Sequence, residues 1–245
     1  MTIASLAMYP FTEVQPAYDK LWDGVRRRLS FEAPALDWDV AADVACRRPD
    51  LILGQTCGWP LITELRSIVT VVGTFDCDIA GGAEGTYRSV LVTGRSDTLV
   101  DILRSPDLRV VANSPDSLSG WISLQAVAAE HGVHLDNIDW SGAHAKSIEV
   151  LRDHRADLAA IDAVSWSHLD RTGLSVVGEG PRIPCLPLVT SGSSPAAVIT
   201  ELRGALADTV ADPTMADVCA TLRIRGFVDR QLADYEELSA LAQLG

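Results

Sequence analysis

The chain has 245 residues, of which 47% are hydrophobic and 22% charged, a composition typical of a globular protein long enough for a large core. Its formal net charge is −13, and its 20 lysines and arginines are scattered apart from the run Arg26-Arg27-Arg28. The sequence therefore predicts no basic surface of the kind that neutralises phosphate groups. This excludes nucleic acid and anionic membranes as expected partners.

The thiol and imidazole groups predict no metal site. The cysteines are odd in number and form no C-x-x-C pair, so neither a zinc site nor a disulfide framework is indicated. His131, His134, His154 and His168 have no ligand spacing with acidic or cysteine partners. We expect no metal and no other cofactor, and buried free thiols at Cys46, Cys57, Cys77, Cys185 and Cys219.

The N-terminal segment favours a cytoplasmic protein. Residues 1–8 lead into Tyr9-Pro10 without a basic region, a long apolar run or a small-residue cleavage site, so they predict a first strand rather than a signal peptide. The alternative is a periplasmic or extracellular protein whose sequence is trimmed to its mature form. No segment approaches the roughly 18 consecutive apolar residues of a membrane span, and membrane insertion is not expected.

Apolar runs bounded by turn residues alternate with helical patterns along the chain, which predicts an α/β fold with a mostly parallel sheet. The expected elements are a strand at 3–8, a helix at 16–29, strands at 51–54, 67–73, 89–93 and 108–112, a helix at 119–131 closed by Gly132, a strand at 137–140, a helix at 145–153, and strands at 157–162 and 188–190. Three helices follow, beginning near Pro195, Pro213 and Asp229, and no strand is expected after Thr190.

Two stretches, 87–93 and 186–190, are places where the chain could change lobes. Two such crossovers would make one lobe from residues 1–91 and 189–245 and a second lobe from residues 92–188. A two-lobed α/β protein of this kind binds its ligand in the cleft between the lobes, where strands end and helices begin.

The most informative segment is residues 113–120, with the sequence Asn-Ser-Pro-Asp-Ser-Leu-Ser-Gly, which we call the serine loop. It follows the apolar run 108–112 and leads into a predicted helix. The first N–H groups of a helix lack intrahelical partners and carry the positive end of its dipole, so this loop suits a small anion. The alternative is that its serines only cap the helix.

Further polar and aromatic residues follow other predicted strands, and each has a structural alternative. Tyr9 could instead cover the core, Gln55 and Thr56 could form a plain turn, and His144 and Asp162 could cap helices. Because ligands in open α/β sheets lie beyond the carboxyl ends of strands, we predict that these residues converge. The predicted ligand-binding set is Tyr9, Gln55, Thr56, Tyr87, Ser117, Leu118, Ser119, Gly120, His144 and Asp162, with Arg88 and Thr190 in neighbouring loops.

Several enzyme classes find no support in the sequence. The glycine-rich stretch 81–85 is too irregular for a Walker or dinucleotide-binding fingerprint, so ATP and NAD are not expected. No Gly-x-Ser-x-Gly motif is present, and no serine or cysteine has a general base beside it in the sequence. No catalytic residue is therefore predicted.

The combined motifs resemble the phosphonate-type substrate-binding proteins of ABC transporters. The resemblance rests on Ser117-Leu118-Ser119-Gly120, Gly142-Ala143-His144, the run 156–162, Gln55-Thr56-Cys57-Gly58 and Thr86-Tyr87-Arg88-Ser89, and it covers most of the chain. It implies a type II periplasmic-binding-protein fold that closes on its ligand. Ser117, Ser119, Gly120 and His144 would hold an anionic head, and Tyr9, Gln55, Tyr87 and Asp162 would hold the remainder. Leu118 stands where the phosphonate binders have a hydroxyl residue.

The expected function is that of a solute-binding protein for a small anionic or zwitterionic, phosphonate-like metabolite, with an ABC permease as partner. The alternative is a cytoplasmic enzyme on the same scaffold, similar to the menaquinone-pathway proteins that catalyse dehydration or ring closure, with Asp162 or His144 as general base. A third alternative is a detached sensor that passes ligand-induced closure to a partner protein.

Overall fold

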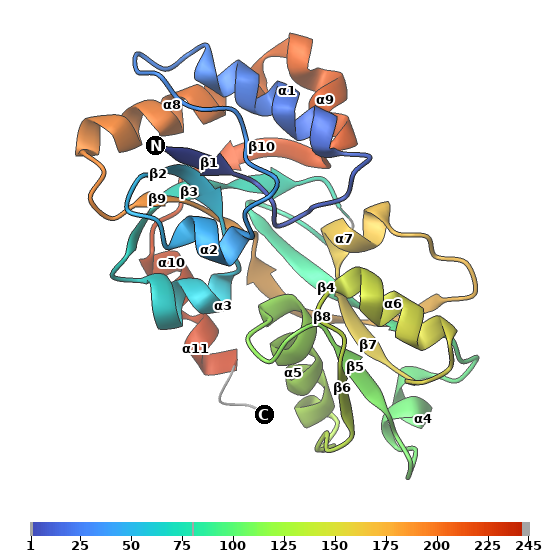
Figure 1. Cartoon of the computed structure of the whole chain (residues 1–245). Helices are drawn as coiled ribbons and strands as arrows, with labels where there is room; N and C mark the ends of the chain where they lie inside the picture. Colours follow the sequence, from blue (N-terminus) through green and yellow to red (C-terminus); the bar gives the residue numbers. More distant parts are fainter. Residues whose placement is uncertain (1, 80, 242–245) are drawn as a thin grey trace. The chain divides into compact units, whose positions relative to one another are not determined.

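The computed structural model describes residues 2–79 and 81–241. Their helices and strands form an α/β structure, as predicted (Figure 1). The described residues gather into two compact units: unit 1 holds residues up to 78, 82–86 and 184–236, and unit 2 holds residues 79 and 81, 87–183 and those from 237 onward. Two of the boundaries lie inside the strands β4 (Thr86–Thr93) and β8 (Ser175–Pro184).

Unit 1 is built on a five-stranded sheet with the strand order β1-β2-β9-β3-β10. Apolar runs form its interior; Leu51 and Leu53, for example, are almost fully buried. The strands are β1 (Ile3–Ser5), β2 (Leu51–Gln55), β3 (Val69–Cys77), β9 (Pro187–Ser191) and β10 (Ile224–Val228).

This sheet is mixed, so the prediction of a mostly parallel sheet is wrong. β1 pairs parallel to β2, whereas β9 runs antiparallel to both β2 and β3, and β10 runs antiparallel to β3. The prediction assumed a helical crossover between neighbouring strands, as parallel pairs require. β9 instead enters the sheet from unit 2 and lies between β2 and β3, so no β-α-β unit fixes its direction.

Strand β10 also corrects the expectation that no strand follows Thr190. Its sequence is interrupted by Arg225 and Gly226, so it has no continuous apolar run. It becomes a strand because it pairs with the edge of β3, with an irregular register between Ile224 and Gly226. Pairing with a distant strand is a tertiary effect that local propensity does not contain.

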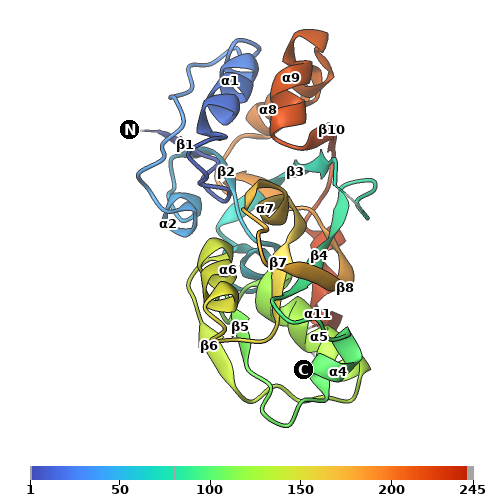
Figure 2. The same cartoon turned by 90° about the vertical axis from the view of Figure 1, so that its right-hand side faces the viewer.

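Helices cover both faces of the unit 1 sheet, with α1, α8 and α9 on one face and α2, α3 and α10 on the other (Figures 1 and 2). The helices of this unit are α1 (Gln15–Arg26), α2 (Ala42–Cys46), α3 (Gly58–Pro60), the π-helix η1 (Leu61–Leu65), α8 (Ala196–Ala211), the 3-10 helix η3 (Pro213–Met215), α9 (Ala216–Thr221) and α10 (Ala233–Glu236).

Helix α1 illustrates how the sequence determines this packing. Tyr18, Leu21, Trp22 and Val25 recur at the spacing of one helix face, and all four are buried. The Trp22 indole N–H donates a hydrogen bond of 2.8 Å to the Pro34 carbonyl. The largest side chain on this face is thus buried without leaving its polar group unsatisfied.

Unit 2 contains a sheet with the order β7-β4-β8 and a parallel pair of strands, β5-β6. A parallel bridge between Val110 of β5 and Leu158, the residue before β7, joins the pair to the sheet. β4 runs antiparallel to β7. The other elements are α4 (Leu99–Leu103), β5 (Val110–Ala112), the π-helix η2 (Leu118–Ile122), α5 (Ser123–Glu130), β6 (Ile138–Trp140), α6 (His144–Arg152), β7 (Ala159–Asp162), α7 (Ala163–His168) and α11 (Leu238–Leu241).

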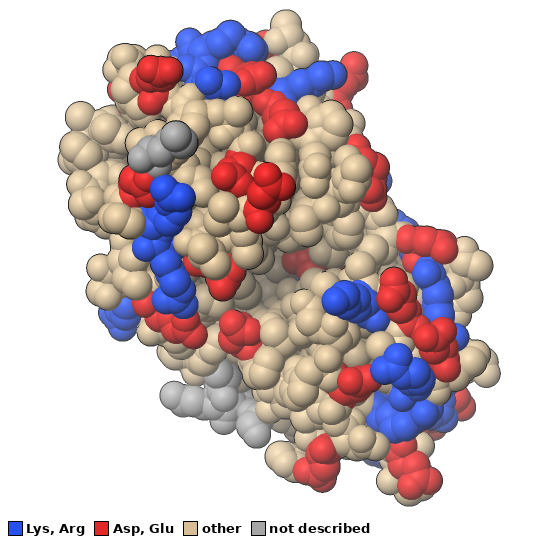
Figure 3. Space-filling view, viewed as in Figure 1, with Lys and Arg blue, Asp and Glu red and all other residues tan. Residues whose placement is uncertain are grey.

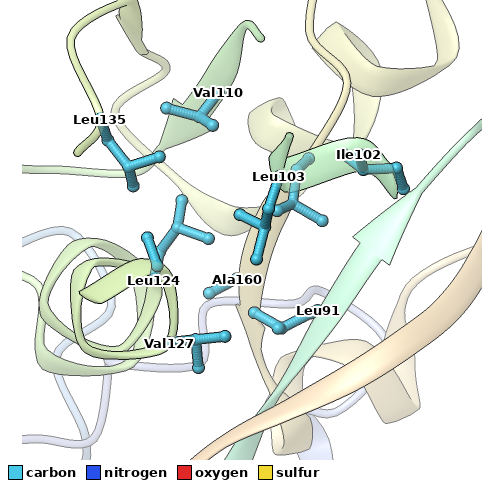
Figure 4. Close-up of a cluster of buried hydrophobic side chains, with 10 residues drawn as sticks. Leu91, Ile102, Leu103, Val110, Leu124, Val127, Leu135 and Ala160 are labelled. Atoms are coloured by element: carbon cyan, nitrogen blue, oxygen red, sulfur yellow. The ribbon is translucent and has the colours of Figure 1, made fainter. Parts of the chain in front are cut away.

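The strands of unit 2 send alternate side chains to two separate hydrophobic cores, as the two-residue period of a strand requires. One core packs against α4 and α5 and is drawn in Figure 4; it contains Leu91, Ile102, Leu103, Val110, Leu124, Val127, Leu135 and Ala160. The other packs against α6 and α7 and contains Val92, Val111, Ile148, Leu151, Ala159, Ile161 and Trp166. Both faces of β4, β5 and β7 are therefore covered, and polar residues at the strand ends mark the edge of the cores.

The helix predicted at 119–131 begins instead with a π-helical turn. η2 covers Leu118–Ile122 and continues directly into α5, which ends at Glu130. Gly132 follows with a φ of +69°, a left-handed conformation that favours glycine, so the predicted helix stop is confirmed. π-helical turns are rare and occur often at functional sites, so residues 118–122 are candidates for a functional role.

The five cysteines are free thiols, as predicted. Four are buried, whereas Cys57 is half-buried, which corrects the expectation that all five are buried. Burial raises the pKa of the Cys46 thiol to about 12, so this group stays protonated and unreactive near neutral pH.

Candidate functional site

The serine loop follows β5 and includes the first three residues of η2, and one of its hydroxyls bonds within the loop. The Ser117 Oγ atom accepts a hydrogen bond of 3.0 Å from the Gly120 N–H, so Ser117 is the N-cap of η2. Ser117, Leu118 and Ser119 are all buried. The capping alternative therefore holds for Ser117, while the remaining first N–H groups of the helix keep the general anion-binding potential of a helix start.

Gly120 has no room for a side chain. An ideal Cβ atom built on it would lie 1.9 Å from the Asn113 Oδ1 atom and 3.0 Å from the Ser117 Oγ atom. The Asn113 Oδ1 atom is itself buried and has no hydrogen-bond partner. Asn113 was not among the predicted site residues, although it is the first residue after the strand; glycine at position 120 is what allows its side chain to occupy this space.

Helix α6 places a histidine beside the serine loop. His144 is the first residue of α6, and its Nε2 atom lies 3.1 Å from the Ser119 Oγ atom. Its Nδ1 atom is buried without a hydrogen-bond partner. Burial lowers the pKa of His144, and the nearby Asp162 carboxylate opposes this effect only in part. The imidazole is therefore neutral near pH 7 and can donate or accept a hydrogen bond without carrying charge.

The lowered pKa of His144 predicts acid sensitivity. Below the ordinary histidine pKa of 6.5, the unfolded chain takes up a proton that the folded chain resists, so the free energy of unfolding falls as the pH decreases. For one proton this slope is at most about 1.4 kcal/mol per pH unit. Urea unfolding between about pH 7.5 and 5.5 should show a smaller loss of stability in His144→Gln than in the native chain. If the free energy of unfolding of the native chain and of His144→Gln depended on pH in the same way, the lowered pKa of His144 would be contradicted.

Asp162 lies at the end of β7, as predicted, and is buried. Its Oδ1 atom accepts a hydrogen bond of 2.8 Å from the Ser165 N–H and so caps α7. Across the sheet it pairs with Ser89 of β4, whose Oγ atom donates a 2.6 Å hydrogen bond to the Ser119 carbonyl. This chain of contacts connects Asp162 to the serine loop through a residue that the sequence analysis had not selected.

Tyr87 belongs to the same face of β4 as Ser89, because side chains two residues apart in a strand point the same way. Its side chain is almost fully buried. Arg88 lies between them and points to the other face, where its guanidinium donates a 2.8 Å hydrogen bond to the Gly180 carbonyl. Arg88 thus has a structural partner in unit 2.

The predicted residues of unit 1 lie at the carboxyl ends of its two parallel strands. Tyr9 follows β1, Gln55 ends β2, and Thr56 comes next; all three are buried. The Gln55 Oε1 atom has no hydrogen-bond partner, and the Thr56 N–H donates to the Pro187 carbonyl. Thr190, in contrast, donates its hydroxyl to the Leu51 carbonyl and is part of the sheet's own bonding.

The structure thus brings together one group within unit 2 from four separate segments. Hydrogen bonds, strand pairing and electrostatic contact link its members, which are Ser89, Asn113, Ser117, Ser119, Gly120, His144 and Asp162. Ser89 and Asn113 lie in motifs that the sequence analysis quoted, but neither was among the predicted ligand-binding residues. Their signals were weak: Ser89 alternates with Tyr87 along a strand, and Asn113 directly follows β5.

This group carries no cationic side chain among its hydrogen-bonded members. In the described part of the chain, neither lysine nor arginine bonds to Ser117, Ser119 or His144. Basic and acidic side chains are instead interspersed on the face shown in Figure 3. Within residues 2–79 and 81–241, no cluster of three or more histidine, cysteine or acidic side chains could hold a metal ion. The polar groups that bond within this group are therefore hydroxyls, backbone groups and an imidazole.

Residues 68–235 match the model of a protein family described as "ABC transporter, phosphonate, periplasmic substrate-binding protein". This match covers more than half of the 245 residues. The chain belongs to this family. It is therefore a substrate-binding protein, as the motifs predicted, and the family implies a small-molecule ligand and an ABC permease as partner. A search of the curated proteins found no match.

Solved structures support the fold of this substrate-binding protein. A binding protein component of an ABC phosphonate transporter from Pseudomonas aeruginosa aligns with a TM-score of 0.70 and 18% identity over 99% of this chain and 85% of that one. PhnD1 from Prochlorococcus marinus, in complex with methylphosphonate, aligns with a TM-score of 0.69 and 17% identity over 94% of this chain and 93% of that one. A Xanthomonas citri protein bound to ATP aligns with a TM-score of 0.68 and 15% identity over 100% of this chain and 96% of that one.

At these identities the similarity establishes the fold alone. The predicted two-lobed periplasmic-binding-protein fold is confirmed, since the similar structures are binding proteins of this type. Among the described residues, no helix combines the length and apolar character that a membrane crossing requires.

Proposed function

We propose that this substrate-binding protein binds a small oxyanion through the start of η2 and the start of α6 in unit 2. The observation that carries the proposal is the contact of 3.1 Å between the Ser119 Oγ and His144 Nε2 atoms, which brings two helix starts together. Two helix starts offer several N–H groups and two partial positive charges to one anion.

The anionic head would be held by neutral donors. Ser119 and His144 would share one contact with the head: when the His144 Nε2–H donates to the Ser119 Oγ atom, the hydroxyl donates to the anion, and in the other tautomer the His144 Nδ1–H does so. Gly120 would let the backbone approach the head closely, while its N–H donates to the Ser117 cap. Neutral donors are suited to an anion because they do not pair with a side-chain carboxylate before the ligand arrives. The neutral state of His144 fits this arrangement, since burial lowers its pKa.

The rest of the ligand would contact residues with other chemistry. Asp162 offers carboxylate oxygens that can accept from an ammonium, a hydroxyl or an acidic P–OH group, and Tyr87 lies on the neighbouring strand. Tyr9, Gln55 and Thr56 of unit 1 and the backbone of Leu118 are further proposed contacts. The unpartnered Gln55 Oε1 atom supports a ligand that carries a hydrogen-bond donor.

A phosphonate-like metabolite is the ligand class that these observations favour. The family description names phosphonate, and PhnD1 from Prochlorococcus marinus carries methylphosphonate. Leu118 provides no hydroxyl at the centre of the serine loop, so the head would depend more on backbone N–H groups. The periplasm, named in the family description, is the compartment we propose, in place of the cytoplasm that the N-terminal segment favoured.

Calorimetric titration tests this proposal. Methylphosphonate, inorganic phosphate and methanesulfonate would be titrated into the native chain and into Ser119→Ala and His144→Ala. Each variant is expected to bind the preferred oxyanion about 10- to 100-fold more weakly, because a hydrogen bond to a charged group contributes about 1.5–3 kcal/mol. His131→Ala and Ser193→Ala, which lie outside the group, serve as controls. Unchanged affinity in both site variants would reject the assigned site.

A further inference from the structure

Two tryptophans flank the serine loop in unit 2. Trp121 directly follows Gly120 in η2, and Trp140 is the last residue of β6, four positions before His144. Their rings contact each other edge to face, with centroids 5.3 Å apart and an angle of 76° between the planes. This geometry is a favourable arrangement for an aromatic pair, so each ring fixes the position of the other.

Backbone hydrogen bonds tie Trp140 to the start of the serine loop. Trp140 pairs with Ala112 in the parallel β5-β6 ladder. Directly after it, the Ser141 N–H donates to the Ala112 carbonyl over 3.0 Å, and the Gly142 N–H donates to the Asn113 carbonyl over 2.9 Å. The segment that carries Trp140 therefore runs beside the segment that carries Asn113 before each reaches its helix.

The two rings differ in burial. Trp121 is half-buried and packs against the core that contains Leu124. Trp140 is 43% exposed, one of the few large apolar side chains in the described residues with so much accessible surface. In those residues neither indole N–H has a hydrogen-bond partner, unlike Trp22 and Trp38, whose indoles both donate.

The position of Trp140 on β6 leaves its ring accessible. Among the strands of the described residues, β6 pairs with β5 alone and forms an edge of its sheet. Protein edges are commonly protected by charged residues, proline or a covering element rather than by an exposed indole. The two touching rings instead present an aromatic surface beside the segments proposed to hold the anion, and ligand pockets are lined mainly by apolar and aromatic side chains.

We propose that Trp140, braced by Trp121, is a specificity-determining residue that packs on the organic part of the ligand. The ligand class is then an oxyanion that carries a flat apolar or aromatic group, rather than the smallest phosphonates. This inference rests on the proposed function, because the same ligand's anionic head would lie at Ser119 and His144. The ring face of Trp140 would contact the organic group, and its N–H could donate to a polar substituent.

Two ligands with the same head and different organic groups test the inference. Phenylphosphonate and methylphosphonate would be titrated into the native chain and into Trp140→Ala, Trp140→Phe and the control Val176→Ala, another exposed apolar residue of unit 2. The native chain is expected to bind phenylphosphonate about tenfold more tightly. Trp140→Ala should weaken phenylphosphonate binding about tenfold more than methylphosphonate binding, Trp140→Phe should retain much of the preference, and Val176→Ala should change neither.

Tryptophan fluorescence of the native chain supplies a measurement that needs no variant, and Trp140→Phe then assigns the signal to one ring. Phenylphosphonate should change the emission of the native chain, and this change should be reduced in Trp140→Phe. Equal affinity for the two ligands, or an equal loss of both in Trp140→Ala, would overturn the role of Trp140 and leave the oxyanion site intact. No binding of either ligand or of inorganic phosphate would overturn the proposed function, and this inference with it.

Discussion

Gly120→Ala is expected to weaken oxyanion binding by about 100-fold or more. The added Cβ atom would lie 1.9 Å from the Asn113 Oδ1 atom, much closer than two non-bonded atoms can approach. Either Asn113 or the start of η2 must move, and the helix start carries the N–H groups proposed to hold the anion. Because a shift of about 1 Å at a binding or catalytic centre can cost about 100-fold, the loss should be large.

The measurement is the affinity for methylphosphonate or inorganic phosphate by calorimetry, with the far-ultraviolet circular dichroism of each variant as a check on folding. Asn113→Ala combined with Gly120→Ala should recover part of the affinity, because it removes the clashing atom. Gly204→Ala is a matched control, since a Cβ atom there meets nothing within 4 Å and the residue lies in helix α8. Native affinity in Gly120→Ala would show that the helix start does not hold the ligand.

The sequence predicted those elements whose pattern is local. Helix α1 repeats apolar residues at a helical spacing, and its observed bounds Gln15–Arg26 differ from the predicted 16–29 only at the ends. β10 was missed because its short sequence becomes a strand only through pairing with β3. The direction of β9 was predicted incorrectly for a related reason: it depends on where the chain returns from unit 2.

The candidate site was predicted in part because its loops lie where strands end. Ser119 and His144 are 25 residues apart, and no local rule predicts their contact of 3.1 Å. The same fold information was needed to find Ser89, whose partner is a carbonyl 30 residues away. Sequence could nominate the serine loop, but it could not decide between capping and binding for each hydroxyl: Ser117 caps, whereas Ser119 bonds to the histidine.

Buried polar atoms without hydrogen-bond partners lower the stability of the fold, so their position in the candidate site bears on its function. Unpartnered buried acceptors such as the Asn113 Oδ1 atom cost about 1–3 kcal/mol each in a folded protein. A cost of this kind is retained where another requirement outweighs it. In unit 2 two of these atoms lie on Asn113, the first residue of the serine loop, and on His144, which bonds to Ser119 of that loop. This concentration supports a ligand role for the loop better than its serine content does.

Trp22→Ala is expected to lower the free energy of unfolding by about 3–5 kcal/mol, the usual cost of truncating a buried tryptophan. The side chain is 1% exposed and fills the space between α1 and the rest of unit 1, so its removal leaves a large cavity. The Pro34 carbonyl also loses the indole N–H that donates to it over 2.8 Å. Trp22→Phe should cost less, because it keeps an aromatic ring and loses mainly this hydrogen bond.

Urea unfolding followed by circular dichroism gives the comparison, with Trp38→Ala as the matched control. Trp38 is half-buried and its indole donates to the exposed Asp19 carboxylate, so its removal should cost clearly less than removal of Trp22. Because unit 1 and unit 2 each have their own core, unfolding in two steps is possible, and the Trp22→Ala effect should then fall on the step that belongs to unit 1. Equal losses in Trp22→Ala and Trp38→Ala would contradict the packing described for α1.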